Sequence, residues 1–337
     1  MVFIIRLNKY LSVKDIPGLL YTAMRGIQSY QSLQAGWQDA SGRDDLLRIL
    51  LYFDIFQYPL HRQEIRQYLA EPATGEQLDS WLSAMIAEKK IFLHKEFYSV
   101  QDNPLLALRR QQGNERAGKL VEKGLKIGRF LYQFPFVSGV AISGSLSKNY
   151  ADEKADIDFF IITRSNRLWL ARTLMHICKK FAFLTGRQHY FCMNYYVDEQ
   201  ALLLDEKNIF TAIEIKTLLP VSGTNSLHQF HQSNGWTASW LPGFPERIQS
   251  KPDRKNNFFK RAGEWIWNGS FGDRLDQWLY RITQKRWAKK AKKGKRNMKG
   301  LPMELDTGKH YARSNPGAFR EKVLQAYHDR LKQYDVV

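Results

Sequence analysis

Apolar residues recur at helical spacing three times between residues 44 and 90 and then alternate, which predicts three helices followed by a hairpin. Two aspartates begin the first helix and Pro59 closes it, while Thr74 is placed to cap the third. The expected elements are helices near 44–58, 61–69 and 74–90 and a short hairpin over 91–100. We therefore predict a compact unit over residues 44–105, preceded by a helical lead-in over residues 1–43.

This order of elements resembles a winged helix, and the stretch YFDIFQYPLHRQEIRQYL carries the resemblance. The resemblance implies DNA binding through the third helix. The polar face of residues 74–90, however, offers mainly acidic and small side chains, with basic residues only at Lys89 and Lys90. Because phosphate contacts need lysine and arginine, we expect this winged-helix-like unit to pack within the chain or dock a protein partner more readily than DNA.

The remaining pattern predicts an α+β chain. Residues 106–134 read as a polar connector helix and residues 135–222 as a mixed sheet with flanking helices, because strand, strand, helix and strand follow in order. The expected core elements are strands over 136–145 and 156–163, a helix over 167–186 and a strand over 187–197. Residues 223–337 read as a mostly helical, basic region with a final helix near 316–333.

Two aspartates stand one residue apart where the second of these strands begins. In a strand, Asp156 and Asp158 would project to the same side while Ile157 points into the core. Neighbouring carboxylates repel at neutral pH unless a cation lies between them or one takes up a proton. Their oxygens suit magnesium, which is commonly completed by substrate phosphates. The turn at Gly144 and Ser145 would let the backbone approach those phosphates closely.

Together these residues resemble the nucleotidyltransferase signature of the DNA polymerase beta superfamily. The signature begins with an apolar residue, a Gly and then a second Gly or a Ser, which ISGS matches. After a spacer it continues with Asp, an apolar residue, an acid and another apolar residue, which DIDFF matches. The resemblance implies that Asp156 and Asp158 hold one or two magnesium ions. It implies that Gly144 and Ser145 bind the β- and γ-phosphates of a nucleoside triphosphate, and that Lys148 reaches the same triphosphate. The reaction would transfer a nucleoside monophosphate to an acceptor hydroxyl.

Members of that superfamily usually carry a third carboxylate on a later strand. The strand YFCMNYYV offers Asn194 at its middle, an amide that can ligate a metal through oxygen but brings no charge and is no useful base. Asp198 and Glu214 are further candidates for a third ligand or an acceptor site. A second interpretation is therefore a catalytically degenerate domain that binds a nucleotide or docks a partner.

The segments FCMNYYV, NIFTAIEI and SNGWTASWLPGF resemble, across residues 45–245, a group of bacterial proteins that pair a nucleotidyltransferase-like domain with flanking helices. The resemblance names a fold and leaves the acceptor open.

The chain of 337 residues has a formal charge of +18, which indicates an anionic partner. Nine of the fifteen residues 285–299 are Lys or Arg, as in a solvated surface segment or in an arm that binds nucleic acid or acidic lipid headgroups. A nucleic-acid-binding protein is thus a third interpretation. Two cysteines are too few for a disulfide framework, and no apolar run approaches the roughly 20 residues that span a bilayer, so we expect a cytoplasmic protein.

Overall fold

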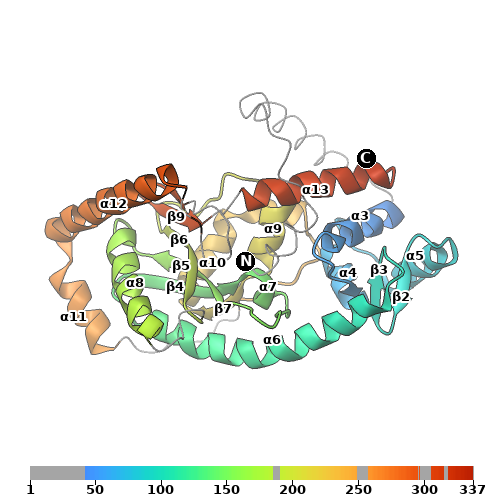
Figure 1. The fold of residues 1–337 in the computed structure, drawn as a ribbon, viewed down its shortest axis with the longest axis horizontal. Coiled ribbons are helices and arrows are strands. Elements are labelled where there is room, and N and C mark those ends of the chain that lie inside the picture. The colour runs from blue at the N-terminus through green and yellow to red at the C-terminus, as the bar shows by residue number, and fades with distance from the viewer. Residues whose placement is uncertain are drawn as a thin grey trace.

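The described part of the chain is mixed α+β and contains two sheets, one of six strands and one of three (Figure 1). The computed structural model describes residues 42–184, 190–248, 257–294, 296, 305–314 and 318–336. Residues 1–41 of the expected lead-in and parts of the basic segment 285–299, namely residues 295 and 297–299, lie outside the described residues.

Residues 42–99 form three helices and a hairpin, which we call the helical unit. The helices are α3 (Gly42–Asp54), α4 (Arg62–Tyr68) and α5 (Gly75–Ala87), and the hairpin strands are β2 (Phe92–His94) and β3 (Phe97–Ser99). Thr74 caps α5 as its position suggests, since its Oγ1 accepts from the Gln77 N–H at 3.2 Å. The pattern did not predict β1 (Leu60–His61), which pairs with β3 and makes the hairpin a three-stranded sheet.

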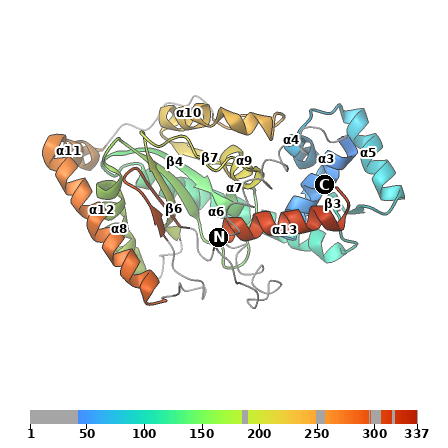
Figure 2. The ribbon, with the colours of Figure 1, turned by 90° about the horizontal axis from the view of Figure 1, so that it is seen from above.

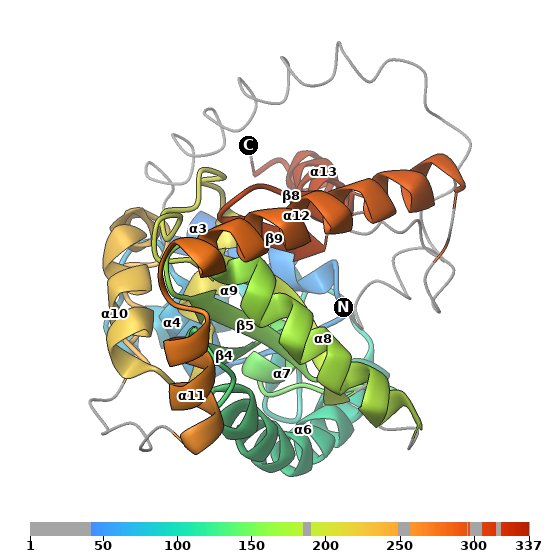
Figure 3. The same cartoon turned by 90° about the vertical axis from the view of Figure 1, so that its left-hand side faces the viewer.

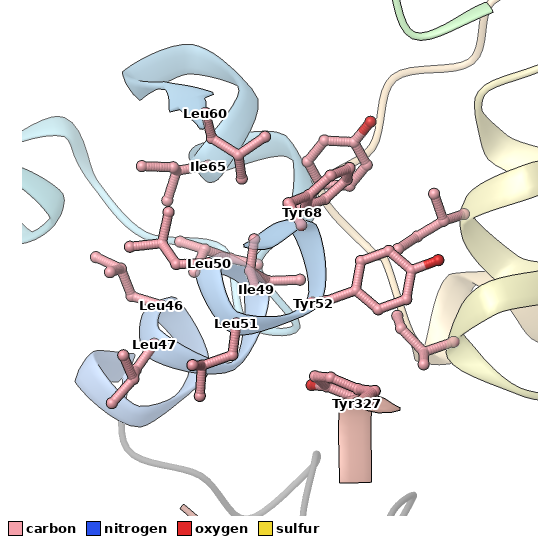
Figure 4. Packing of buried hydrophobic residues seen from close by; sticks show 14 of the residues in the cluster. Leu46, Leu47, Ile49, Leu50, Leu51, Tyr52, Leu60, Ile65, Tyr68 and Tyr327 are labelled. Carbon is pink, nitrogen blue, oxygen red and sulfur yellow. The ribbon is translucent and has the colours of Figure 1, made fainter. Parts of the chain in front are cut away.

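The helical unit shares its core with distant parts of the chain. Its buried residues pack with residues of α9 (Ile209–Lys216) and α13 (Phe319–Gln333) in one apolar cluster. Figure 4 shows Tyr327 of α13 against α3, and its ring centroid lies 5.5 Å from that of Tyr52. The guanidinium of Arg330 pairs with the carboxylate of Asp54 beside this contact. The helical unit is therefore held by segments that follow it by more than one hundred residues.

The six-stranded sheet has the order β7-β4-β5-β6-β9-β8. Its strands are β4 (Val137–Ser143), β5 (Asp158–Thr163), β6 (Cys192–Asp198), β7 (Leu219–Ser222), β8 (Leu305–Thr307) and β9 (Tyr311–Ser314). β5 runs antiparallel to β4 and parallel to β6. None of β7, β8 and β9 was predicted: β7 lies at the end of residues 135–222, expected to hold the sheet, and β8 and β9 lie in residues 223–337, which we expected to be mostly helical. Each is only three or four residues long, too short for the alternation of a strand to be recognised.

Helices cover both faces of this sheet, and side chains that alternate along β5 contact one group of helices or the other. Phe159 and Ile161 pack in the cluster that includes residues of α6 (Pro104–Leu131), which runs along the lower edge of the molecule in Figure 1. Phe160 and Ile162 pack on the other face, in a cluster with residues of α10 (Thr224–Ser233). Asp158 has the same parity as Phe160 and therefore faces the α10 side.

Helix α8 (Leu168–Leu184) packs on the α6 side and is covered by α12 (Gly269–Lys292) (Figure 2). The carboxylate of Asp276 on α12 accepts a hydrogen bond of 2.7 Å from the Leu170 N–H in the first turn of α8. Arg167 donates to the Gly269 carbonyl at 3.0 Å and pairs with Asp273. These contacts join the beginnings of the two helices, so they run side by side.

Burial raises the pKa of Asp276 from its ordinary value of 3.8 to about 6. The folded protein therefore binds more protons than the unfolded chain between about pH 4 and 6, and this residue makes the free energy of unfolding fall as pH rises through that window. Asp276→Asn keeps a hydrogen-bond acceptor and removes the titration.

As pH rises across this window, we expect the free energy of unfolding of the wild type to fall relative to that of Asp276→Asn by about 1 kcal/mol per pH unit. Urea unfolding of both proteins at several pH values measures the difference. Parallel pH profiles for the two proteins would contradict the role given to Asp276.

Candidate functional site

A cavity of about 230 Å³ is lined by residues of both the six-stranded sheet and the helical unit. Aromatic side chains are the largest group in its wall. The aromatic lining residues are Tyr52, Phe53, Phe56, Tyr58, Phe160, Tyr195, Phe210, Phe230 and Phe319. The polar side chains that reach it come from the end of β4 and the turn after it, the start of β5, the middle of β6, the loop at Glu206, strands β8 and β9, and helices α9 and α13. It is therefore an apolar cavity with a few polar groups, as is usual for small-molecule sites.

Gly144 and Asp158 meet at one end of this cavity. Ser143, the last residue of β4, pairs directly with Asp158, the first residue of β5. Gly144 follows with φ at +70° and begins the short helix α7 (Gly144–Ser147). A Cβ atom on residue 144 would lie 2.9 Å from Asp158 Oδ2. Both the backbone conformation and this close approach require glycine here.

Asn194 reaches the same carboxylate from the neighbouring strand. Phe159 is paired with Met193 and Phe160 with Tyr195, so Asn194 is an extra residue in β6, a β-bulge. Bulges redirect side chains and are uncommon in parallel pairs. Here the Asn194 amide donates to Asp158 Oδ1 and its oxygen accepts from the Cys192 thiol at 3.1 Å. The bulge thus directs the Asn194 amide at the carboxylate of Asp158.

The two aspartates of the sequence motif are placed differently. β5 begins at Asp158, so Asp156 lies in the loop before the strand, and the side-by-side projection expected from strand alternation does not apply to it. Asp156 is half-buried and does not line the cavity. Burial is the main reason that the pKa of the Cys192 thiol is raised to about 12, and the negative charges of Asp158 and Asp156 add to the shift.

Lys148 occupies the other side of the Gly144 turn. Its side chain is 8% exposed, and the ammonium donates to the Gly144 carbonyl at 3.1 Å and forms an ion pair of 2.6 Å with Glu214 of α9. Tyr58 of the helical unit donates its hydroxyl proton to the Lys148 carbonyl. Gly144, Ser145, Lys148, Asp158, Asn194 and Glu214 therefore share one cavity.

Asp198 does not join them. It ends β6, opposite Thr163, while Asp158 and Cys192 pair at the start of the same two strands. Its carboxylate is fully buried and accepts from the Asn166 N–H at 3.0 Å and from His310 Nδ1 at 2.8 Å. Asp198 therefore ties the far end of the sheet to two loops.

The sequence reasoning missed a group of charges on the cavity wall. Arg313 of β9 donates to Glu206 at 2.8 Å and to Asp306 at 2.6 Å, and Arg320 of α13 lies 3.1 Å from the same Glu206. Asp306, Arg313 and Arg320 lie more than one hundred positions beyond the motif, and Glu206 follows β6 in a loop without a recognisable pattern. The pairing of β6 with β9 and of β9 with β8 brings Arg313 and Asp306 to the site.

The oxygen ligands of this site fit magnesium that arrives with a phosphate ligand. Asp158 faces the cavity, Asp156 stands two residues before it in the preceding loop, and one or two carboxylates plus phosphate oxygens are a usual magnesium environment. Among the residues that the structure describes, no group of three or more His, Cys, Asp or Glu is arranged to hold a metal. An ion here would therefore depend on the ligand for part of its coordination.

Gly144→Ala should lower the free energy of unfolding by about 1–2 kcal/mol, because alanine is disfavoured at positive φ and its methyl group would press on Asp158. Gly118→Ala is the matched control, since Gly118 lies within α6 and a Cβ there meets nothing within 4 Å. That control should stabilise the protein by about 0.5–1 kcal/mol. Urea unfolding compares the two variants, and equal effects would contradict the proposed strain at Gly144.

Comparison of the chain with protein-family models, with curated proteins and with solved structures gives no match. In the described part of the chain, no helix combines the length and the apolar character needed to cross a bilayer. The functional assignment therefore rests on the cavity and the residues around it.

Proposed function

We propose that the cavity binds a nucleoside triphosphate with magnesium, and that the chain is a nucleotidyltransferase that moves the nucleoside monophosphate to an acceptor hydroxyl. The observation that carries the proposal is the convergence of the Gly144 turn, Lys148 and Asp158 on one cavity. Each offers what a triphosphate needs: close backbone approach, a positive charge and a carboxylate for the accompanying cation.

Lys148 is the residue that would meet the phosphates. A cation that is only 8% exposed needs an opposite charge, and Glu214 supplies it across 2.6 Å. Phosphate oxygens are strong acceptors for the same ammonium, so a bound triphosphate would share or replace this ion pair. Glu214 accordingly acts as the counter-ion that holds Lys148 beside the turn before the nucleotide binds.

The aromatic wall suits the rest of the substrate. Nucleobases stack on aromatic side chains, and each such contact is worth about 1–3 kcal/mol. Phe160 and Phe230 pack on the same side of the sheet as Asp158, with ring centroids 4.6 Å apart. A base or an apolar acceptor can therefore lie against this wall while the phosphates face Lys148.

In the transfer, the acceptor oxygen bonds to the α-phosphorus as the bond to pyrophosphate breaks, and the hydroxyl proton is lost. Magnesium, when bound, offsets the negative charge of the triphosphate and of the leaving pyrophosphate. Asp158 and Asp156 would hold it. Asn194 cannot take the proton, because an amide is no base at neutral pH.

Binding without transfer is the second candidate. The hydrogen bond from the Asn194 amide to Asp158 favours it, because a third metal-binding carboxylate would stand beside Asp158 in an active site. Glu214, the nearest alternative on the cavity wall, is engaged by Lys148. A degenerate site of this kind would hold a nucleotide and regulate a partner.

Nucleotide binding is tested with Lys148→Met. Isothermal titration with each nucleoside triphosphate and magnesium should give saturable binding to the wild type, and the variant should lose about tenfold to a hundredfold in affinity, because a hydrogen bond to a charged group is removed. Lys154→Met is the matched control, since Lys154 is exposed in the loop between α7 and β5. Absence of saturable binding to the wild type would rule out both candidates.

Transfer is tested by pyrophosphate release in the presence of magnesium and candidate acceptors. Asp158→Asn should abolish release if the wild type is active. Asn194→Asp separates the candidates, since it places a carboxylate where the bulge aims the amide. Release that appears only in Asn194→Asp would identify a degenerate wild-type site, and release that persists in Asp158→Asn would contradict transfer at this cavity.

A further inference from the structure

Large exposed hydrophobic side chains are concentrated at one end of the molecule. Thirteen such residues are exposed among the described residues, and six of them lie on α11 (Phe258–Ile266) and α12. They are Phe258, Phe259, Trp265, Ile266, Phe271 and Trp278, each between 55% and 83% exposed. Figure 3, in which this end faces the viewer, shows α8, α11 and α12 together. Exposed hydrophobic residues concentrated in this way indicate an interaction surface.

The outer face of α12 combines two of these aromatics with cations. Phe271, Arg274, Trp278, Arg281 and Lys285 are all exposed and follow one another at spacings of three and four residues, which places them on one side of the helix. The other side, with buried Gly272 and Asp276, packs toward α8. α12 is thus an amphipathic helix whose outward stripe is aromatic toward its beginning and basic toward its end.

The charge of this surface is positive. α12 contains seven basic and two acidic residues, and both acids are engaged toward α8. Asp273 pairs with Arg167, and Asp276 accepts from the Leu170 N–H. Glu264, the acid of α11, accepts from the Phe136 N–H at 3.0 Å. The outward cations of α12 are therefore not balanced by acids on the same helices.

We propose that α11 and α12 form a peripheral docking surface for membranes that contain anionic lipid. Phenylalanine and tryptophan side chains partition into the boundary between headgroups and acyl chains, while lysine and arginine bind the anionic headgroups. A bilayer surface can take both kinds of side chain at once.

Two other occupants fit less well. Nucleic acid would use the cations, but aliphatic Ile266 and the exposed phenylalanines of α11 add little to phosphate contacts. A second copy of the chain, docked through the same face, would bring two positively charged surfaces together. An anionic lipid surface complements the charge together with both the aliphatic and the aromatic side chains, whereas stacking with the bases of a single strand would use only the aromatic ones.

The experiment is vesicle flotation with the full chain. Vesicles of phosphatidylcholine with phosphatidylglycerol should carry the protein upward, vesicles of phosphatidylcholine alone should not, and binding should weaken with added salt. Flotation is repeated with free inorganic phosphate or glycerol phosphate to distinguish a lipid surface from a soluble phosphate ligand. Neither compound should reduce vesicle binding at millimolar concentration.

Two double variants test the surface. Arg281→Gln with Lys285→Gln should lower the partition coefficient about thirtyfold, because each basic residue near an anionic surface contributes a factor of about five. Trp265→Ala with Trp278→Ala should also reduce binding and remove the blue shift of tryptophan emission on vesicle addition. The matched controls are Lys119→Gln with Lys126→Gln and Leu105→Ala with Phe130→Ala, exposed residues of α6 that should leave partitioning unchanged.

Several outcomes would overturn the proposal. The first three are absence of flotation with anionic vesicles, an equal loss of vesicle binding in the α6 control variants, and competition by soluble phosphates. The fourth is binding of a nucleic acid duplex or single strand that depends on the same residues, without binding to vesicles. A dimer in light scattering that Trp265→Ala with Trp278→Ala dissociates would likewise assign the face to a second copy. Circular dichroism and thermal unfolding of each variant verify that the fold is kept, which the exposure of these side chains favours.

Discussion

The antiparallel pairing of β4 with β5 is the constraint on which the site depends. It sets Ser143 opposite Asp158, so the turn that follows one strand meets the carboxylate that begins the other. Gly144 can then approach Asp158 as closely as it does only because it has no side chain. A slip of one residue in this register would turn Asp158 to the opposite face of the sheet, away from the cavity.

The parallel pairing of β5 with β6 adds Asn194 to the Gly144 turn and Asp158. A regular strand would place Asn194 on the same side as Tyr196, which packs with Met193 in the cluster of the α6 face. The bulge interrupts that alternation, so Tyr195 and Asn194 can both serve the cavity side. A local irregularity is retained because the hydrogen bond to Asp158 and the packing of Tyr195 compensate for the lost pairing.

The pattern of apolar residues was sufficient for the long elements, because the spacing of a helix or of a buried strand is repeated several times in each. It was insufficient for β7, β8 and β9, where three or four residues give no period. The motif located Gly144, Ser145, Lys148 and Asp158 in one cavity, since its residues are held by adjacent strands. It could not show where β5 begins, and so it treated Asp156 as a strand residue.

Side chains brought from a distance were beyond sequence reasoning. Asp198 is only four residues from Asn194, yet four residues of strand extend about 13 Å, which takes it to the other end of the sheet. Glu214 was one of the candidates for a third ligand, and its ion pair with Lys148 could not be foreseen because the two residues are 66 positions apart. Arg313 and Arg320 had no local signal, because tertiary pairing alone gives them their place.

The position of α13 has a consequence for the order in which the chain acquires its structure. Phe319 and Arg320 line the cavity, and Tyr327 and Leu331 complete the core around α3. During synthesis the helical unit emerges before both α9 and α13, so the part of its apolar face that α13 covers stays exposed while more than two hundred residues are added. The cavity consequently takes its final form only after α13 has been synthesised and has packed against α3.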